Sequence, residues 1–157
     1  MRVGLGYDVH QLARGEELIL GGVKIDYSMG LVGHSDADVL LHAIKDSLLG
    51  AIGAGDIGSH FPDDDPQYKD ISSLVLLEQV MDSVLEAKYE VNNLDAIIIA
   101  QQPKLAPYIS QMENKIAQKL QVEVGQVNLK ATTTERLGFI GQGEGIAAQA
   151  IVSIKER

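Results

Sequence analysis

Three of the four histidines in this 157-residue chain occur within its first 42 residues, close to several carboxylates. Asp8 and His10 form one group, and His42 follows the acidic stretch 34–38. No cysteine is present to act as a competing ligand. Two histidines and one carboxylate leave the fourth position of a tetrahedral Zn²⁺ site open, which is the catalytic pattern. We therefore expect Asp8, His10 and His42 to bind zinc together, although each histidine alone better fits a partly buried polar residue and Asp8 alone a turn acid.

A strand over residues 2–10 would place the first two ligands together. Polar and apolar residues alternate along it, and a period of two puts Asp8 and His10 on one face, about 7 Å apart at Cα. Gly4 and Gly6 lie on that same face and leave room for another element to approach. The spacing thus predicts a rigid strand that presents two ligands toward a neighbouring element.

That neighbour is expected to be a helix from about Asp36 to Leu49, which carries His42. Ser35 followed by Asp38 resembles a capping box at its start. The apolar face of this helix is predicted to comprise Leu41, Ile44, Leu48 and Ile52. Asp38 and Asp46 share a polar stripe with His42, where either carboxylate could orient the imidazole or simply face solvent.

Two further stretches have the chemistry to bind phosphate. His34 and Ser35 precede the predicted helix, where exposed amides attract anions, although Ser35 also fits a simple N-cap. The hydroxyls and carboxylate of 131–135 follow a predicted strand and suit phosphate with Mg²⁺, or else form a plain polar turn. The glycines of 141–145 precede a strand, so they do not match a dinucleotide-binding fingerprint.

The remaining pattern predicts one domain over 1–157 with an α/β (α+β) fold. The expected order is strand, small hairpin, two helices, strand, helix and two strands. Besides the strand and helix described above, we expect a hairpin at 18–25 with a Gly21-Gly22 turn, a loop at 27–33 and a functional loop at 55–66. Further helices are predicted at 72–88 and 107–120, and further strands at 94–101, 127–131 and 146–154. These elements make one mixed four-stranded sheet with helices on one face. The last strand is apolar on both sides, which indicates either a central strand or a homo-oligomer packed sheet to sheet.

Composition excludes several classes of partner. A net charge of −9 argues against nucleic acid, but a small phosphorylated substrate remains possible if divalent cations offset the charge. No run approaches the ~20 apolar residues of a membrane span. The first residues resemble neither a signal peptide nor a transit peptide, so we expect a cytoplasmic bacterial protein or a processed plastid-type organellar form.

Five blocks along the chain together resemble the 2-C-methyl-D-erythritol 2,4-cyclodiphosphate synthase family of the non-mevalonate isoprenoid pathway. The blocks are DVH at 8–10, HSDADVLLHAIKDSLLGA at 34–51, GDIGSHFPDDDP at 55–66, AQQPKLAP at 100–107 and NLKATTTERLGFIGQGEGIAAQA at 128–150. They cover essentially the whole chain in the family's order and spacing. The resemblance implies a phosphorus–oxygen lyase, a homotrimer with active sites between subunits, and a CDP-linked small-molecule substrate. In that family the substrate's 2-phosphate attacks the β-phosphorus of its own CDP group, and CMP leaves.

By position, the resemblance also implies roles for individual residues. Asp8, His10 and His42 match the Zn²⁺ ligands, and Glu135 matches the ligand of a second ion, Mg²⁺ or Mn²⁺. His34 and Thr133 match the catalytic groups that stabilise the transition state. Substrate contacts are also matched by five of the residues just named, Asp8, His10, His34, Thr133 and Glu135. The remaining matches to substrate contacts are Ser35, Asp56, Gly58, Phe61, Asp63, Asp65, Ala100, Pro103, Lys104, Leu105, Ala106, Ala131, Thr132, Thr134, Phe139 and Gln142.

One position departs from the family pattern. Many members carry arginine where this chain has Gln142, and that arginine lies with the aromatic matching Phe139 in a cavity on the trimer axis that holds an isoprenoid diphosphate. Glutamine lacks the charge and the bidentate fork, so we expect weak or absent diphosphate binding there. Two other functions remain open: a metal-dependent phosphohydrolase of a nucleotide-type substrate, whose zinc would activate water, and a non-enzymatic nucleotide- or metal-binding trimer.

Overall fold

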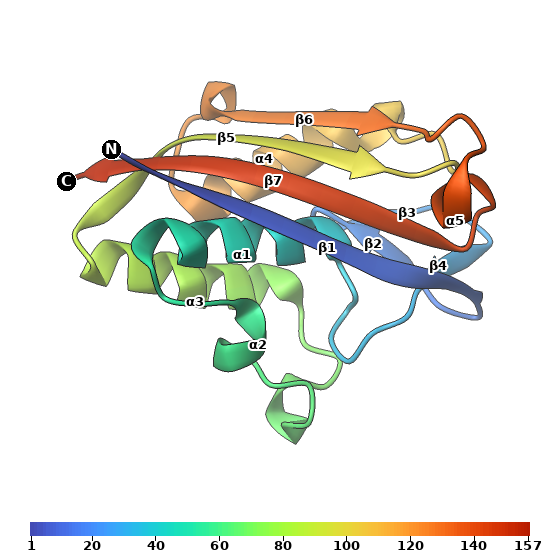
Figure 1. Ribbon diagram of the computed structural model, residues 1–157, viewed down its shortest axis with the longest axis horizontal. Helices are drawn as coiled ribbons and strands as arrows, with labels where there is room; N and C mark the ends of the chain where they lie inside the picture. Colours follow the sequence, from blue (N-terminus) through green and yellow to red (C-terminus); the bar gives the residue numbers. More distant parts are fainter.

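A five-stranded mixed sheet forms the body of the protein in the computed structural model, which describes residues 1–157 (Figure 1). The strand order is β4-β1-β7-β5-β6, and only the β5–β6 pair is parallel. The strands are β1 (Arg2–Arg14), β4 (Met29–Leu31), β5 (Tyr89–Ile99), β6 (Val127–Thr132) and β7 (Gly145–Glu156). β2 (Leu18–Leu20) and β3 (Val23–Ile25) form a separate hairpin. Both termini lie at one end of the molecule, because Arg2 pairs with Ile154.

Three helices cover one face of this sheet, as the sequence predicts. α1 (Val39–Ile52) packs on β1 and β7, while α3 (Ser73–Glu86) packs against α1 and against α4 (Ile109–Leu120). Leu41, Ile44 and Leu48 of the predicted apolar stripe are fully buried, and its fourth member, Ile52, is partly buried against the core. No helix in the chain has both the length and the apolar character needed to cross a membrane.

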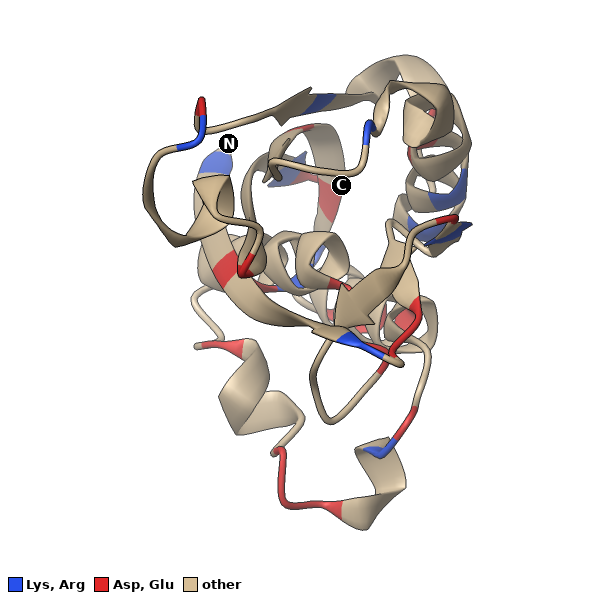
Figure 2. Ribbon diagram, turned by 90° about the vertical axis from the view of Figure 1, so that its right-hand side faces the viewer, with Lys and Arg blue, Asp and Glu red and all other residues tan.

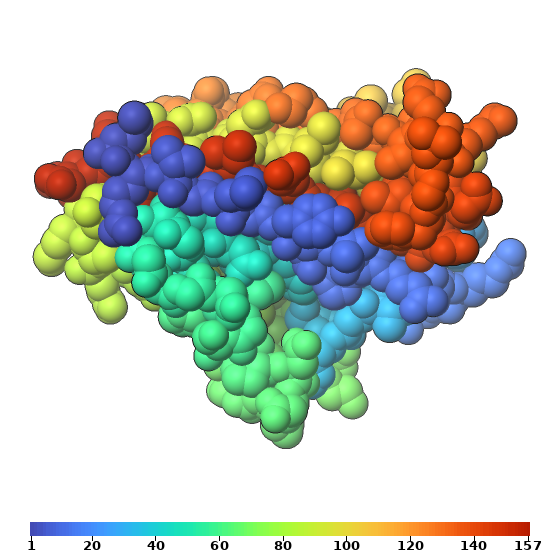
Figure 3. All heavy atoms as spheres, in the orientation of Figure 1, coloured from blue at the N-terminus to red at the C-terminus, as the bar shows by residue number.

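The opposite face of the sheet carries uncovered apolar side chains. Along β1, Val3, Leu5, Tyr7 and Val9 are all exposed, with Val3 61% and Leu5 59% accessible. Ile151 of the neighbouring β7 is also exposed. Figure 3 shows β1, in blue, lying open on the surface beside the red β7. The alternation predicted for 2–10 is therefore correct, and its apolar side faces outward.

The side of β1 that faces the helices depends on two glycines. A Cβ at Gly4 would lie 1.8 Å from the carbonyl oxygen of Ser47, and one at Gly6 would lie 1.9 Å from that of Ala43. Both oxygens belong to the backbone of α1, so neither position has room for a side chain. The prediction that these glycines admit a neighbouring element is confirmed, and this close approach brings the ligands of β1 to α1.

Four predictions of secondary structure need correction. The strand predicted at 94–101 is β5, which begins at Tyr89 and ends at Ile99. The sheet has five strands, because the predicted loop at 27–33 contains the short edge strand β4. α1 begins at Val39 and not at Asp36, because the Asp38 side chain caps it by accepting from the Leu41 amide, and Ala37 has a left-handed φ of 56°. The loop at 55–66 includes α2 (Ile57–His60) and leads into the 3-10 turn η1 (Pro66–Tyr68).

The segment between α1 and α3 projects from the body and is rich in acids (Figure 2). The run Asp63 to Asp65 lies in this segment, between α2 and η1. The other short elements are η2 (Ala106–Tyr108), η3 (Val124–Gln126) and α5 (Gly138–Gly141). The Gly21-Gly22 turn of the hairpin is confirmed, with φ of 57° and 73° at its two residues.

Candidate metal centre and active-site cavity

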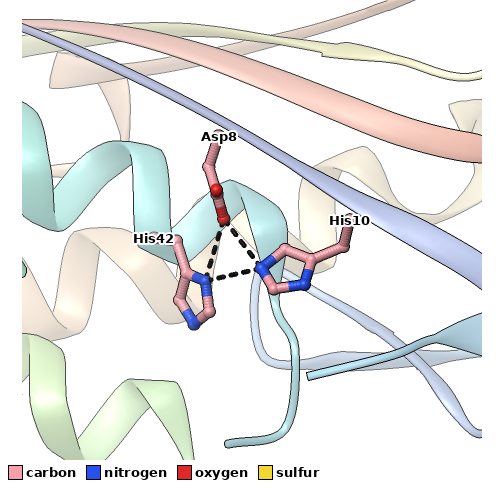
Figure 4. Close-up of side chains that lie close together, drawn as sticks. All are labelled: Asp8, His10 and His42. Atoms are coloured by element: carbon pink, nitrogen blue, oxygen red, sulfur yellow. Dashed lines mark hydrogen bonds and ion pairs between the residues drawn. The ribbon is translucent and has the colours of Figure 1, made fainter. Parts of the chain in front are cut away.

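Asp8, His10 and His42 converge on one point between β1 and α1 (Figure 4). Asp8 Oδ2 lies 2.9 Å from His10 Nε2 and 2.9 Å from His42 Nδ1, and the two ring nitrogens are 3.1 Å apart. Asp8 and His10 are two residues apart on the strand, and α1 supplies His42 because Gly4 and Gly6 let it approach closely. The predicted grouping of these three side chains is therefore present in the fold.

The outer nitrogen of each imidazole has a partner that turns the other nitrogen toward this point. His10 Nδ1–H donates to the Val32 carbonyl at 2.7 Å, which leaves the Nε2 lone pair facing inward. His42 Nε2 lies 3.2 Å from Ser35 Oγ, and a donated Nε2–H leaves its Nδ1 lone pair facing inward. Such outer hydrogen bonds usually fix the tautomer of metal-binding histidines. Neither Asp38 nor Asp46 serves this role: Asp38 accepts from backbone amides that include Leu41, and Asp46 accepts from the first amide of α2.

Burial and hydrogen bonding shift the pKa values of all three groups. Burial raises the pKa of the Asp8 carboxyl, but the hydrogen bonds with His10 and His42 outweigh it and hold that pKa well below its usual range. Burial lowers the pKa of His10, but its bonds to Asp8 and to the Val32 carbonyl raise it above the usual value. Burial lowers the pKa of His42, and Asp8 only partly opposes this. The Asp8 carboxylate and the two imidazoles thus stabilise one another through these hydrogen bonds.

This donor set fits Zn²⁺. Zinc–nitrogen and zinc–oxygen bonds near 2.0–2.1 Å in a tetrahedron imply ligand atoms about 3.3 Å apart, within ~0.5 Å of the separations seen here. One carboxylate oxygen and two neutral imidazole nitrogens supply three ligands, and the cavity beside them leaves the fourth side accessible. The three atoms already lie as ligands of one ion would.

A cavity of about 230 Å³ opens beside the three ligands. Its wall contains most of the residues predicted for this half of the site, together with several that the sequence analysis did not single out. The predicted ones are Asp8, His10, His34, Ser35, His42, Gly58, Phe61 and Asp63, and the others are Gly33, Lys45, Ile57, Tyr68 and Leu76. Lys45 had a detectable signal, because it follows His42 by three residues and so shares its side of the helix.

Two acids predicted to contact substrate lie outside the wall of this cavity. Asp56 caps α2, where its Oδ1 accepts from the Ser59 amide at 2.9 Å. Asp65 caps η1 in the same manner, and its backbone carbonyl accepts from His34 Nε2–H at 3.0 Å. Both side chains thus hold the projecting segment in shape, and Asp65 also fixes the His34 ring.

A second, larger pocket of about 810 Å³ brings together the two later blocks of the sequence. It lies where the ends of the parallel strands β5 and β6 meet, so 100–106 and 131–135 are neighbours. Its wall comprises Tyr27, Ala100, Gln101, Gln102, Pro103, Lys104, Leu105, Ala106, Ala131, Thr132, Thr133 and Glu135. Thr134 is not part of this wall, because its hydroxyl donates to the Leu137 carbonyl at 2.7 Å.

The two predicted catalytic residues are not brought together within one chain. His34 lines the cavity beside the three ligands and Thr133 lines the second pocket, and the two walls have no residue in common. Phe139 lines a third hollow, of about 520 Å³, beside β1. Gln142 lies outside that wall, and its amide donates to the Arg136 carbonyl. Neither observation tests diphosphate binding on the trimer axis, so its expected weakness stays a prediction.

Comparisons with known proteins agree along the whole chain. The model of the YgbB family matches residues 1–155. A curated relative from Alkaliphilus metalliredigens, named 2-C-methyl-D-erythritol 2,4-cyclodiphosphate synthase, is 64% identical over 98% of this chain and 97% of its own. The bifunctional IspDF structure from Campylobacter jejuni has a TM-score of 0.96 at 44% identity, covering 99% of this chain but only 42% of that longer one. The structure of IspF from Plasmodium falciparum in complex with CDP has a TM-score of 0.87 at 33% identity, covering 99% and 96%.

Proposed function

This chain belongs to the YgbB family, and from that membership we propose that it is a 2-C-methyl-D-erythritol 2,4-cyclodiphosphate synthase. It converts 4-diphosphocytidyl-2-C-methyl-D-erythritol 2-phosphate into the cyclic diphosphate and CMP. The reaction is an intramolecular phosphoryl transfer of the lyase type, in the non-mevalonate route to isoprenoid precursors. The observation that carries the proposal is the cluster of Asp8, His10 and His42 beside a cavity, in a chain that matches these synthases from end to end.

The residues of this cavity suit a reaction that needs alignment and charge neutralisation. Zn²⁺ held by Asp8, His10 and His42 would act as a Lewis acid on a phosphoryl oxygen. His34, fixed by the Asp65 carbonyl, would stabilise charge on the transferring group. The substrate supplies its own nucleophile, so no covalent enzyme intermediate is required. Holding both phosphates of one molecule in line can supply several kcal/mol, roughly 7–11 at the upper end of effective molarity.

The second pocket is proposed to hold the cytidine and diphosphate groups. Backbone groups of 100–106 would read the base, and the hydroxyls of Thr132 and Thr133 would bind phosphate oxygens. Glu135 is the proposed ligand of a second divalent ion, Mg²⁺ or Mn²⁺, because hard cations prefer carboxylate and phosphate oxygens. The pocket volume of about 810 Å³ is ample for a nucleotide.

We further propose a homotrimer in which neighbouring subunits complete each active site. Two observations support this assembly. The cavity with His34 and the pocket with Thr133 are separate within one chain, so they can act on one substrate only if a second subunit supplies one of them. The apolar residues of β1 and β7 also stand exposed on the open face of the sheet, where a neighbouring sheet would bury them.

Product analysis in ¹⁸O-labelled water distinguishes the synthase from a phosphohydrolase. The synthase forms cyclic diphosphate and CMP and incorporates no ¹⁸O, because no water attacks. A linear phosphate ester that contains ¹⁸O would establish the hydrolase instead. A protein that binds CDP and zinc but leaves the substrate unchanged would be the non-enzymatic alternative.

Replacing His42 with alanine tests the ligand assignment. The His42→Ala variant should lose both zinc, measured by elemental analysis, and turnover. His60→Ala is the matched control, because His60 is exposed, lies outside the cavity wall, and its ring donates to the Ala54 carbonyl and lies 6.1 Å from the Phe61 ring. Full activity of His42→Ala in zinc-free form would refute the assignment.

A further inference from the structure

Lys45 is a buried lysine in the wall of the metal cavity, and the functions assigned above do not use it. It lies on α1, one turn beyond His42, and only 1% of its surface is accessible. It is the one lysine or arginine among the residues that line the cavity. Its ammonium nitrogen lies 5.6 Å from the centre of the Phe61 ring, which lines the same cavity.

The ammonium group has neither a hydrogen bond nor an ion pair within the chain, although four carboxylates lie near enough to act on it. Each carboxylate is engaged elsewhere. Asp8 contacts both imidazoles, Asp36 holds the start of α3, Asp38 caps α1, and Asp46 binds the start of α2. The Lys45 side chain is thus buried, while its ammonium group still reaches the cavity and has no hydrogen bond or ion pair of its own.

Such burial is expensive unless a ligand compensates for it. A charged group loses its hydration when it is buried, so buried lysines without partners are rare. Burial lowers the pKa of Lys45 to about 8, and the four nearby carboxylates oppose a larger fall. The side chain is therefore mostly protonated at neutral pH, and its charge is available to an anion that enters the cavity.

We propose that the Lys45 ammonium binds a phosphoryl oxygen of the substrate inside the metal cavity, as a second cation beside the metal. This inference rests on the proposed function and specifies how the cavity holds its phosphate. A doubly charged phosphate entering a wall that contains Asp8 and Asp63 needs more positive charge than one bound ion supplies. Charge-assisted hydrogen bonds from an ammonium group are among the stronger polar contacts in proteins.

The test replaces Lys45 with methionine, which keeps the unbranched shape and removes the charge. Inorganic phosphate is the probe, titrated by calorimetry at pH 7 into zinc-loaded and chelator-treated protein. We expect Lys45→Met to weaken phosphate binding about tenfold to a hundredfold in both forms and to lower kcat/KM by a similar factor. Lys24→Met is the control, because Lys24 is exposed on β3 and paired with Glu17, and it should change neither value.

Stability and zinc content separate this role from a structural one. Removing a buried unpaired charge should leave the melting temperature unchanged or raise it, and zinc content should stay at the wild-type level. If Lys45 only supports the Phe61 ring, Lys45→Met will melt at a lower temperature and bind phosphate normally, which overturns the inference. If the wild type binds phosphate through Lys45 but forms no cyclic product, the proposed function fails and the anion site stands.

Chemical rescue gives a second measurement that a structural role would not reproduce. The chain contains no cysteine, so Lys45→Cys creates a single thiol. Aminoethylation of this thiol, confirmed by mass spectrometry, rebuilds an ammonium of nearly the same reach, whereas the carbamidomethyl adduct is neutral. Phosphate affinity should return with the aminoethyl group alone. Equal affinity of both adducts would show that charge at this position is not required.

Discussion

The hydrogen bonds behind the two imidazoles orient the nitrogens that would bind the metal. His10 is oriented by a backbone carbonyl, but His42 depends on the hydroxyl of Ser35. Removing that hydroxyl leaves the His42 ring free to change its tautomer or rotate. The effect should therefore appear in zinc affinity rather than in folding.

We expect Ser35→Ala to lower zinc affinity by at least about tenfold, the lower end of the effect seen when an outer partner of a metal ligand is removed. Competition with a fluorescent chelator measures this affinity. Ser59→Ala is a matched control, because Ser59 contacts only Asp56 on α2. Unchanged zinc affinity in Ser35→Ala would show that Ser35 does not orient the ring.

Zinc binding should weaken as the pH falls, because the metal must displace a proton. In the metal-free protein the pKa of His10 is raised and that of His42 is lowered, so His10 takes up a proton first as the pH falls. Apparent affinity should be constant above the His10 pKa and should fall about tenfold per pH unit below it, since one proton is released. Chelator competition between pH 5 and pH 8 checks the slope. A slope of two protons per zinc immediately below the His10 pKa would contradict this order of protonation.

At the scale of elements, the contact of β1 with α1 is what the sequence predicts best. The period-two pattern of β1 correctly predicts which of its side chains face α1, and its glycines correctly predict that another element approaches closely. Both predictions succeed because they follow from local sterics. The start of α1 was misplaced, because Ser35, Asp36 and Asp38 can all cap a helix. Tertiary contacts decide among them: Asp36 bonds to the start of α3, and Ser35 turns to His42. β4 was missed because three residues are too few to show a pattern.

Gly6→Ala should destabilise the protein by about 3 kcal/mol or more, at the upper end of overpacking effects, because its Cβ would overlap the backbone oxygen of Ala43. Urea unfolding of the metal-free protein measures this loss. Relief of the overlap requires α1 to move away from β1, so zinc affinity should fall as well. Gly125→Ala is the control: its Cβ meets no atom within 4 Å, and the change should stay within about 0.5 kcal/mol. Equal stability of the two variants would contradict the steric account.

At the scale of the whole molecule, the sequence indicates the metal site more clearly than its surroundings. Spacing alone could suggest Asp8, His10 and His42, but only the fold shows that His34 and Thr133 lie in separate hollows. The spacing from His42 places Lys45 on the same side of α1, but a lysine on a helix normally faces solvent, so the sequence does not predict its burial. Its burial depends on the projecting segment with Phe61, which no local pattern places over α1.

The exposed apolar face of β1 yields a prediction for assembly. Leu5→Asp places a charge at the centre of the proposed interface, so we expect monomers in analytical ultracentrifugation and a loss of turnover, with zinc retained. Val75→Asp is the control, because Val75 is an exposed apolar residue on α3, away from the sheet face. A trimer that persists in Leu5→Asp would place the interface elsewhere.

Shared active sites can be tested by mixing two inactive variants. His42→Ala lacks the metal half of the site, and Thr133→Ala lacks a hydroxyl of the nucleotide half, so each should be nearly inactive alone. Suppose that each active site takes its metal half from one subunit and its nucleotide half from the next. In a mixed trimer, a site is then intact where a Thr133→Ala subunit supplies the metal half and a His42→Ala subunit supplies the nucleotide half. Co-expression at equal levels should then restore roughly a quarter of wild-type activity, as closed cyclic symmetry requires. If the mixture is no more active than the separate variants, both halves of a site belong to the same subunit. We expect the opposite, because the two hollows are separate within one chain.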